Sequence, residues 1–356
     1  MKKNLLILAL AALLTGCGVR TPPAASSSAP VSSGAASASE EPLVLTELTV
    51  ELPRSVDRKA AREALKALPE KMAAYGVKLE AATLTYGASP AAMAEAVAKG
   101  GVMLAILPAE DFLAFGGGAV PILADARQGL TLDETSDLAE WNAGSEERSD
   151  EPEAGAYALV CAAPTEYGRK LAELAQERPL TWAELDHGRW GVLAEDSLPG
   201  NRCLELWLTD HYEDNGLEDL SSVTVYPGWE ELLRAAAEGE IDLLPVLPAL
   251  RFTYSVAWTL ETNRTDESGL RGFGRPLQLY REVPVLAATE RLQSVVAAVS
   301  PTEPALQDPR FAEALYQALN ELCGGPAERK AALGAESFAP VTDEALNGLR
   351  RLNFGT

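Results

Sequence analysis

The sequence predicts an α/β fold of two lobes, each built on its own mainly parallel sheet. Strand-like and helix-like segments alternate along the chain, which is the pattern of α/β folds. One order of elements, a helix followed by a glycine stop and a buried strand, occurs at residues 100–105 and again at 239–244. The globular part also exceeds the usual size of a single domain, which suggests two lobes.

The first lobe begins with a strand at 48–52, where apolar and polar residues alternate. A helix over 58–75 follows, with Pro69 predicting a kink or break and Gly76 the end. Residues 77–84 predict a second strand, and Ser89-Pro90 begins a helix that ends at Gly100. The apolar run 102–108 is typical of a strand in a sheet covered on both faces.

The second lobe repeats the alternation. Strands are expected at 157–162, 190–194 and 223–226, and helices at 165–176, 203–212 and 229–238. Thr181 and Glu184 form a capping box. Acid-rich residues 133–153 predict a solvated loop between the lobes. In the tail, Asp308-Pro309 begins a helix to 322, and two shorter helices at 326–333 and 342–352 return to the first lobe.

Residues 1–17 have the three parts of an export signal: a basic start, an apolar run too short to span a bilayer, and small residues before a cleavage site. The ending Leu-Thr-Gly-Cys17 resembles the lipobox of bacterial lipoproteins, in which the cysteine is lipidated. The alternative is a signal for soluble secretion that contains a cysteine. Two acyl chains are enough for stable anchoring, so the resemblance implies a protein held on the outer face of the cell membrane.

Residues 18–42 are rich in Ser, Ala and Pro and predict a disordered tether. We expect the first lobe to comprise 43–155 and 285–356, and the second 156–284. The chain would then cross between the lobes twice, near 155–156 and near 282–284, and these crossings would form the hinge.

The net charge of −22 argues against binding to nucleic acid or to anionic lipid. The net charge does not exclude an anionic ligand, because salt screens distant charges and N–H donors close to the ligand then dominate. The remaining cysteines, Cys161, Cys203 and Cys323, fit no metal motif, and we expect small buried hydrophobes. With two histidines and no nucleophile–base motif, we expect no enzyme, no metal and no cofactor.

A polar turn, Asp196 to Asn201, lies between the strand at 190–194 and the helix at 203–212. Free N–H groups and the positive end of a helix dipole make such a turn a seat for an anionic group. The alternative is an ordinary strand-to-helix loop.

Roughly over residues 48–352 the order of motifs resembles the substrate-binding proteins of phosphate, phosphite and phosphonate ABC transporters. This family has the type 2 periplasmic-binding fold. The matching segments here are Gly-Gly-Val-Met-Leu-Ala-Ile-Leu-Pro108 with Phe112, Glu184-Leu-Asp-His-Gly-Arg189, Ser197-Leu-Pro-Gly200, Pro326-Ala-Glu-Arg329 and Phe338-Ala-Pro-Val-Thr-Asp343.

The resemblance implies that the hydroxyls and amides of the turn hold an oxyanion. Here Leu198 and Pro199 replace two of the family's donors, and Pro199 also lacks an N–H. An aspartate pair of the family is absent at Leu244-Pro-Val-Leu-Pro248. Arg54 or Arg202 could supply donors instead, or the ligand is a less charged solute.

We therefore expect a lipid-anchored solute-binding component of an ABC importer, monomeric, with a permease and an ATPase as partners. Its ligand would be a small anionic, phosphonate-like solute in the cleft between the lobes. The alternatives are a lipoprotein of this fold that acts as a sensor or surface-interaction module without transport, and an enzyme on the same fold. The expected ligand-binding residues are Ser197, Gly200, Asn201, Arg54, Ser55, Tyr86, Asp111, Phe112 and Tyr254.

Overall fold

The computed structural model describes residues 43–133, 135, 137–144 and 147–355. The predicted signal 1–17, the tether 18–42 and the lipidation site Cys17 lie outside the described residues. Among the described residues, no helix combines the length and the apolar character that a membrane span requires.

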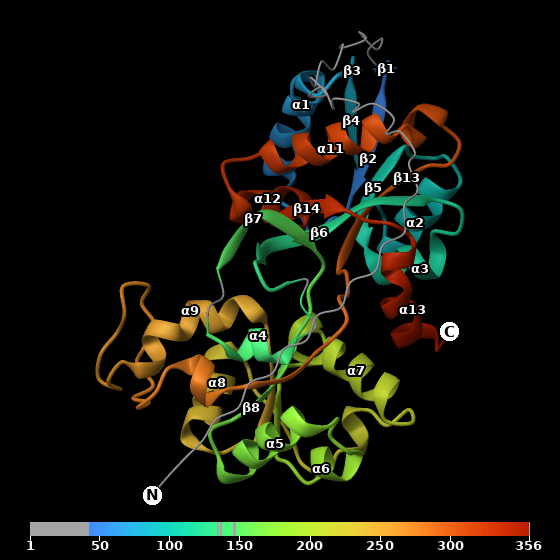
Figure 1. Cartoon of the computed structure of the whole chain (residues 1–356). Coiled ribbons are helices and arrows are strands. Elements are labelled where there is room, and N and C mark those ends of the chain that lie inside the picture. Colours follow the sequence, from blue (N-terminus) through green and yellow to red (C-terminus); the bar gives the residue numbers. More distant parts are fainter. Residues whose placement is uncertain (1–42, 134, 136, 145–146, 356) are drawn as a thin grey trace, which may run out of the picture. The chain divides into compact units, whose positions relative to one another are not determined.

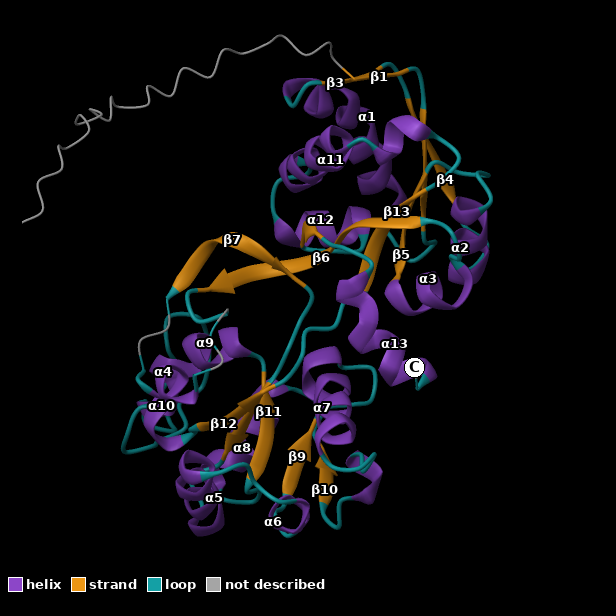
Figure 2. Ribbon diagram, turned by 45° about the vertical axis from the view of Figure 1, so that its right-hand side comes forward, coloured by secondary structure: helices purple, strands orange, loops and turns teal. Residues whose placement is uncertain are grey.

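The larger sheet has seven strands in the order β14-β6-β13-β5-β2-β4, with β7 paired to β6 (Figures 1 and 2). Its strands are β2 (Leu48–Leu52), β4 (Ala82–Tyr86), β5 (Leu104–Pro108), β6 (Val120–Leu130), β7 (Arg148–Ala154), β13 (Val295–Val299) and β14 (Ser337–Pro340). A separate parallel pair joins β1 (Leu43–Leu45) to β3 (Val77–Leu79).

Helices cover both faces of the larger sheet, because successive side chains of β5 enter different cores. Leu104 and Ile106 pack in a cluster with α1, α11 and α12. Ala105 and Leu107 pack in a cluster with α2, α3 and α13. The helices are α1 (Arg58–Ala74), α2 (Pro90–Ala98), α3 (Ala109–Phe115), α11 (Pro309–Glu321), α12 (Pro326–Leu333) and α13 (Asn347–Phe354).

The smaller sheet has five strands in the order β10-β9-β11-β8-β12 (Figure 2). They are β8 (Leu159–Ala162), β9 (Trp190–Val192), β10 (Val223–Val225), β11 (Leu243–Val246) and β12 (Val285–Ala288). Helices α8 and α9 lie on one face and α5, α6 and α7 on the other. The helices of this part are α4 (Leu138–Asn142), α5 (Glu166–Glu177), α6 (Trp182–Asp186), α7 (Cys203–His211), α8 (Trp229–Glu238), α9 (Pro248–Thr259) and α10 (Leu279–Glu282).

Both sheets repeat one topology. In the larger sheet the order β4-β2-β5-β13 places the first strand, β2, between the second and the third, and the antiparallel β13 follows. The smaller sheet has the same arrangement in the order β10-β9-β11-β8, with β8 antiparallel. The chain passes from the larger sheet to the smaller one after β7 and returns after β12. These observations confirm the predicted α/β fold with two lobes and two crossings.

The two crossings are paired with each other. The N–H of Ala156 donates to the carbonyl of Leu292 at 2.8 Å, and the N–H of Leu292 donates to the carbonyl of Ala156 at 2.9 Å. Gly155 has φ of +76°, and a Cβ there would lie 2.7 Å from the Leu292 carbonyl oxygen. Only glycine fits this close approach without strain.

Three expectations need correction. The predicted start of the first lobe's return at 285 is wrong, because β12 pairs with β8 in the smaller sheet and the chain crosses between Ala288 and Val295. Residues 133–153 are not only a loop: they contain α4 and most of β7. Pro69 does not break α1, which continues from Arg58 to Ala74.

Candidate functional site

A hollow of about 620 Å³ lies where elements of both lobes meet the second crossing. One wall is the end of β5 and the start of α3, and another is the turn that follows β9. Its lining residues are Pro108, Glu110, Ala194, Glu195, Asp196, Leu198, Arg202, Gln293 and Ser294. We call this hollow the cleft. Ligands of parallel α/β sheets bind beyond the carboxyl ends of strands, which is where β5 and β9 end here.

The turn after β9 is fixed by its own hydrogen bonds. Ser197 Oγ accepts from the N–H of Gly200 at 3.2 Å, and Asn201 Nδ2 donates to the carbonyl of Leu193 at 3.1 Å. A Cβ at Gly200 would lie 2.6 Å from Ser197 Oγ, so the residue must be small. The Gly200 amide and the Asn201 side chain are therefore used within the turn. The Ser197 hydroxyl still has a proton to donate.

The turn leads into α7 through one π-helical turn, Leu198–Arg202, with Pro199 in its first positions. Proline is tolerated there because the first amides of a helix have no partner within the helix. Arg202 is the last residue of this turn, and its guanidinium NH2 donates to Glu110 Oε1 on α3 at 3.2 Å. This ion pair joins the two lobes across the cleft.

The lining is mainly acidic. Glu110, Glu195 and Asp196 contribute three carboxylates, and Arg202 is the single cation among the lining residues. Arg202 also donates to Asn353 on α13. Its Nε is buried and has no hydrogen-bond partner among the described residues.

The second crossing adds a polar wall. Gln293 is 3% exposed, and its Oε1 has no partner in the described part of the chain. Its neighbour Ser294 is fixed by the buried carboxylate of Asp125, which accepts from the Ser294 N–H at 2.9 Å and from its hydroxyl at 2.5 Å. Arg202 Nε and Gln293 Oε1 thus belong to residues that line the cleft, and both atoms are buried without a hydrogen-bond partner among the described residues.

Three residues expected from the first lobe do not line the cleft. Arg54 and Ser55 are exposed after β2, and Tyr86 lies at the end of β4. The Tyr86 hydroxyl donates to the carbonyl of Arg58 at 3.2 Å, and the Arg58 guanidinium lies 5.2 Å from the centre of its ring. All three follow carboxyl ends of strands as predicted, but on strands farther from the crossings than β5.

Two expected residues lie in hydrophobic cores. Phe112 is 4% exposed, and Tyr254 is 7% exposed and packs edge-on against Phe273 at 5.9 Å. Asp111 lies beside the cleft residue Glu110. Burial first, and then the charge of Glu110, raises the pKa of Asp111.

Five residues line the cleft without being among the expected ligand-binding residues: Glu110, Glu195, Asp196, Gln293 and Ser294. The sequence could have indicated Glu195 and Asp196, because they directly follow a buried strand. It could not have indicated Gln293 and Ser294, because the position of the second crossing depends on the pairing of β12 with β8. Ser197, Gly200 and Asn201 lie in the predicted turn, although their contacts are with the turn itself.

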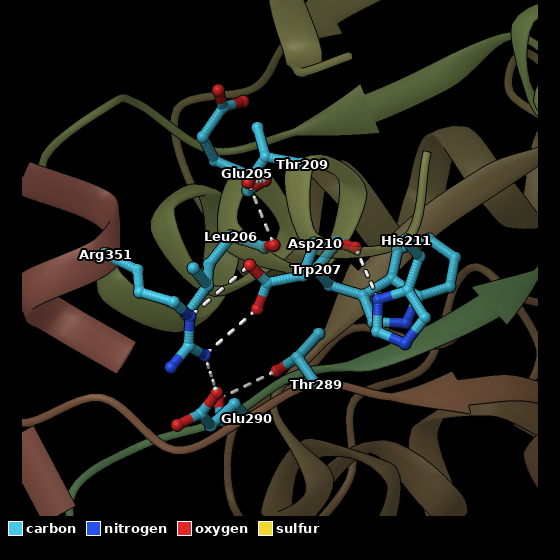
Figure 3. Close-up of polar contacts among 9 residues, drawn as sticks. All are labelled: Glu205, Leu206, Trp207, Thr209, Asp210, His211, Thr289, Glu290 and Arg351. Atoms are coloured by element: carbon cyan, nitrogen blue, oxygen red, sulfur yellow. Dashed lines mark hydrogen bonds and ion pairs between the residues drawn. The ribbon is translucent and has the colours of Figure 1, made fainter. Parts of the chain in front are cut away.

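Helix α7 is held at its far end by α13 (Figure 3). Arg351 of α13 pairs with Asp210 at 3.0 Å and also with Glu290 of the second crossing. Within α7, Thr209 Oγ1 donates to the carbonyl of Leu206 at 3.0 Å, and His211 Nδ1 contacts the carbonyl of Trp207 at 2.8 Å. The two ion pairs of Arg351 connect α7, which follows the turn at the cleft, to the second crossing and to α13.

Cys161 and Cys203 are buried and Cys323 is partly buried, and burial raises the pKa of the Cys203 thiol to about 12. In the described ranges, no cluster of three or more His, Cys, Asp or Glu side chains is arranged to hold a metal ion.

No family model and no curated protein matches this sequence. Among solved structures, XAC2383 from Xanthomonas citri bound to ATP is similar at 13% identity, with a TM-score of 0.42, over 86% of this chain and 98% of that chain. A binding protein component of an ABC phosphonate transporter from Pseudomonas aeruginosa is similar at 10% identity, with a TM-score of 0.35, over 86% and 85%. The periplasmic aliphatic sulphonate binding protein SsuA from Escherichia coli is similar at 11% identity, with a TM-score of 0.34, over 87% and 91%.

These likenesses are too weak to bear on the ligand. The strand order of the two sheets and the paired crossings show the two-lobed α/β fold with two crossings that the sequence predicts.

Proposed function

We propose that this chain is the solute-binding component of an ABC importer and works on the outer face of the cell membrane. The observation that carries the proposal is the cleft, because it is lined by the larger lobe, the smaller lobe and a crossing, beyond the carboxyl ends of β5 and β9. A solute in such a hollow contacts both lobes at once. It therefore favours one arrangement of the lobes over others, which a permease can recognise.

The solute is small and zwitterionic, with an amine and one anionic group. A purely anionic, phosphonate-like solute agrees with the donors of the turn but not with the carboxylates of Glu110, Glu195 and Asp196. A like charge about 4 Å from each carboxylate costs roughly 1–4 kcal/mol near a protein surface. An ammonium group next to Glu195 and Asp196 turns this repulsion into attraction.

The anionic group of the solute binds Arg202. The Nε–H of Arg202 lacks a partner, and its NH2 bonds Glu110, which is 54% exposed and so is easily returned to water. A phosphonate or carboxylate accepts two parallel N–H bonds from a guanidinium. Arg202 thus exchanges an ion pair within the protein for a bidentate pair with the solute.

Calorimetry on the full chain purified in detergent tests both parts of the proposal. We expect aminoalkylphosphonates or amino acids to bind, and the same compounds without the amine to bind at least tenfold more weakly. Arg202→Ala and Glu195→Gln each lower the affinity roughly tenfold or more, the size expected for a hydrogen bond to a charged group. Arg62→Ala and Glu177→Gln, at exposed positions outside the cleft, are the matched controls.

Equal affinities for compounds with and without the amine, together with no effect of Glu195→Gln, would refute the zwitterionic solute. The proposal that the chain binds a solute would still stand. If no solute binds, and the chain does not stimulate ATP hydrolysis by a reconstituted permease and ATPase, the transport role itself is wrong.

The proposed anchor is Cys17, which lies outside the described residues. We expect the wild-type chain to partition into membranes and Cys17→Ser to be released or to remain uncleaved. A soluble wild-type chain whose N-terminus is another residue would contradict the anchor.

A further inference from the structure

A second hollow, of about 600 Å³, shares no lining residue with the cleft. Its walls are β6 and β7 of the larger sheet, the starts of α9 and α12, and β14. A smaller hollow of about 30 Å³ shares Arg127 and Leu247 with it and continues to Tyr157 and Arg291 at the crossings. Both lobes therefore contribute to this second hollow.

The second hollow is basic, although the chain has a net charge of −22. Arg127, Arg148 and Arg329 line it against a single carboxylate, Glu336, whose charge is paired with Lys330 at 3.0 Å. In the smaller part, Arg291 lies 3.8 Å from Glu153 and 3.9 Å from Asp133. The carboxylates of Glu336, Glu153 and Asp133 thus each lie near a cationic side chain, and the second hollow keeps an excess of arginines.

Arg127 forms no ion pair with another described residue, although Glu153 lies opposite it in the pairing of β6 with β7. The Arg127 side chain is exposed, and it makes no hydrogen bond within the described ranges. Its neighbour Arg148 donates to Gln128 Oε1 at 3.1 Å and lies 4.8 Å from the ring centre of Phe252, so Arg148 is held beside it. Arg329 is committed to backbone carbonyls and contributes only its charge.

Two helices also begin at this hollow. Neither Leu247 before α9 nor Gly325 before α12 caps its helix with a side-chain hydrogen bond, and Pro326 of α12 lines the hollow. The first amides of a helix and its dipole favour negative charge at this end. Both effects add to the charges of Arg127 and Arg148.

We propose that this second hollow binds a small oxyanion of the phosphate or carboxylate class, with Arg127 and Arg148 as its cationic ligands. A multi-oxygen anion accepts several N–H bonds at once, which matches the planar guanidinium groups. Because α9 belongs to the smaller lobe and β6 to the larger, the bound anion contacts both. The second hollow shares no lining residue with the cleft, so the two sites can be tested with separate substitutions.

The test uses the full chain in detergent and inorganic phosphate as the probe, with binding measured by calorimetry and by thermal unfolding. We expect phosphate to bind and to raise the unfolding temperature more than chloride at equal ionic strength. Arg127→Ala lowers the phosphate affinity roughly tenfold or more, and Arg127→Lys by less, because a point charge remains. Arg62→Ala leaves the affinity unchanged.

Arg202→Ala separates the two sites. Phosphate that binds in the second hollow is insensitive to Arg202→Ala, whereas phosphate in the cleft is weakened by it and not by Arg127→Ala. Unchanged phosphate binding in Arg127→Ala, or no binding by the wild type beyond that of chloride, overturns the proposal. Neither result would count against the separate proposal that the cleft binds a solute.

Discussion

Asp242 is a buried carboxylate that is held by several donors in the smaller lobe. Arg189 donates to it through Nε at 2.8 Å and through NH2 at 2.9 Å, and Thr165 Oγ1 donates at 2.6 Å. Burial alone raises the pKa of Asp242, but the bonds from Arg189 and Thr165 outweigh it, so the pKa is lowered. These three residues precede β11, β9 and α5, and the cluster fixes the ends of those elements opposite the cleft.

Asp242→Asn should lower the free energy of unfolding by roughly 2 kcal/mol at neutral pH, less than for a fully buried pair because Arg189 is half exposed. The folded-state pKa is below the unfolded value of about 3.9, so the stabilisation is complete above that value and lost as pH falls through the folded pKa. Urea titrations of both proteins should converge on acidification. A difference that is independent of pH would contradict the ionic contribution.

Ser197 caps the turn after β9, and its predicted role in solute binding can be tested separately from this structural role. Its Oγ accepts the Gly200 N–H, so Ser197→Ala should cost about 1 kcal/mol of stability, the usual size for a lost N-cap. Ser197→Thr keeps the hydroxyl and should retain both stability and solute affinity. If Ser197→Ala lowers stability but leaves solute affinity unchanged in calorimetry, the turn is only a strand-to-helix loop.

At the scale of elements, α7 and α13 link the lobes. Cys203 and Leu206 of α7 pack in the same core as Leu346 and Leu349 near the C-terminus. The ion pairs of Arg351 lie at the edge of this core and are partly exposed. Packing therefore gives the stability of the contact, and the ion pairs give its register.

Leu349→Ala should lower the free energy of unfolding by about 3 kcal/mol, because Leu349 is fully buried. Arg351→Ala should cost less than about 1 kcal/mol, as for other partly exposed ion pairs. Hydrogen exchange of α7 should nevertheless become faster in Arg351→Ala. Arg350→Ala, which removes hydrogen bonds to Asp343 and Asn347, is the control and should leave α7 unchanged.

At the scale of the whole described part, the paired crossings decide how the two lobes are connected. Both crossings run between the sheets as extended chain, and Ala156 and Leu292 exchange two hydrogen bonds. Gln293 and Ser294, on the same segment, face the cleft. Any change of lobe arrangement on solute binding must therefore act through backbone that also lines the site.

Gly155→Ala tests this close approach against Gly76→Ala. Both glycines have positive φ, +76° and +81°, but a Cβ at Gly76 has nothing within 4 Å. Gly76→Ala should cost about 1–2 kcal/mol for the left-handed backbone. Gly155→Ala should cost about 1–3 kcal/mol more, for the contact with the Leu292 carbonyl. Equal losses in urea unfolding would show that the crossings separate easily.

Much of the fold followed from local sequence. Ser89 caps α2, Asp308 caps α11, and Glu184 accepts from the Thr181 N–H, all as predicted. The glycine stop at Gly239 has the left-handed conformation that ends α8. Such signals act within a few residues, so the sequence alone determines them.

Tertiary structure decided which sheet each strand joins and which side chains line the cleft. β7 is acidic yet forms a strand because β6 offers it a free edge, and β12 joins the smaller sheet because β8 pairs with it. Arg202 meets Glu110, 92 positions away, and Arg351 meets Asp210, 141 positions away. The sequence alone therefore determined the caps and glycine stops of several helices, the alternation of helices and strands, and the polar turn after β9. Which charges line the cleft was decided by contacts between distant segments, and these contacts exist only when both sheets and both crossings have formed.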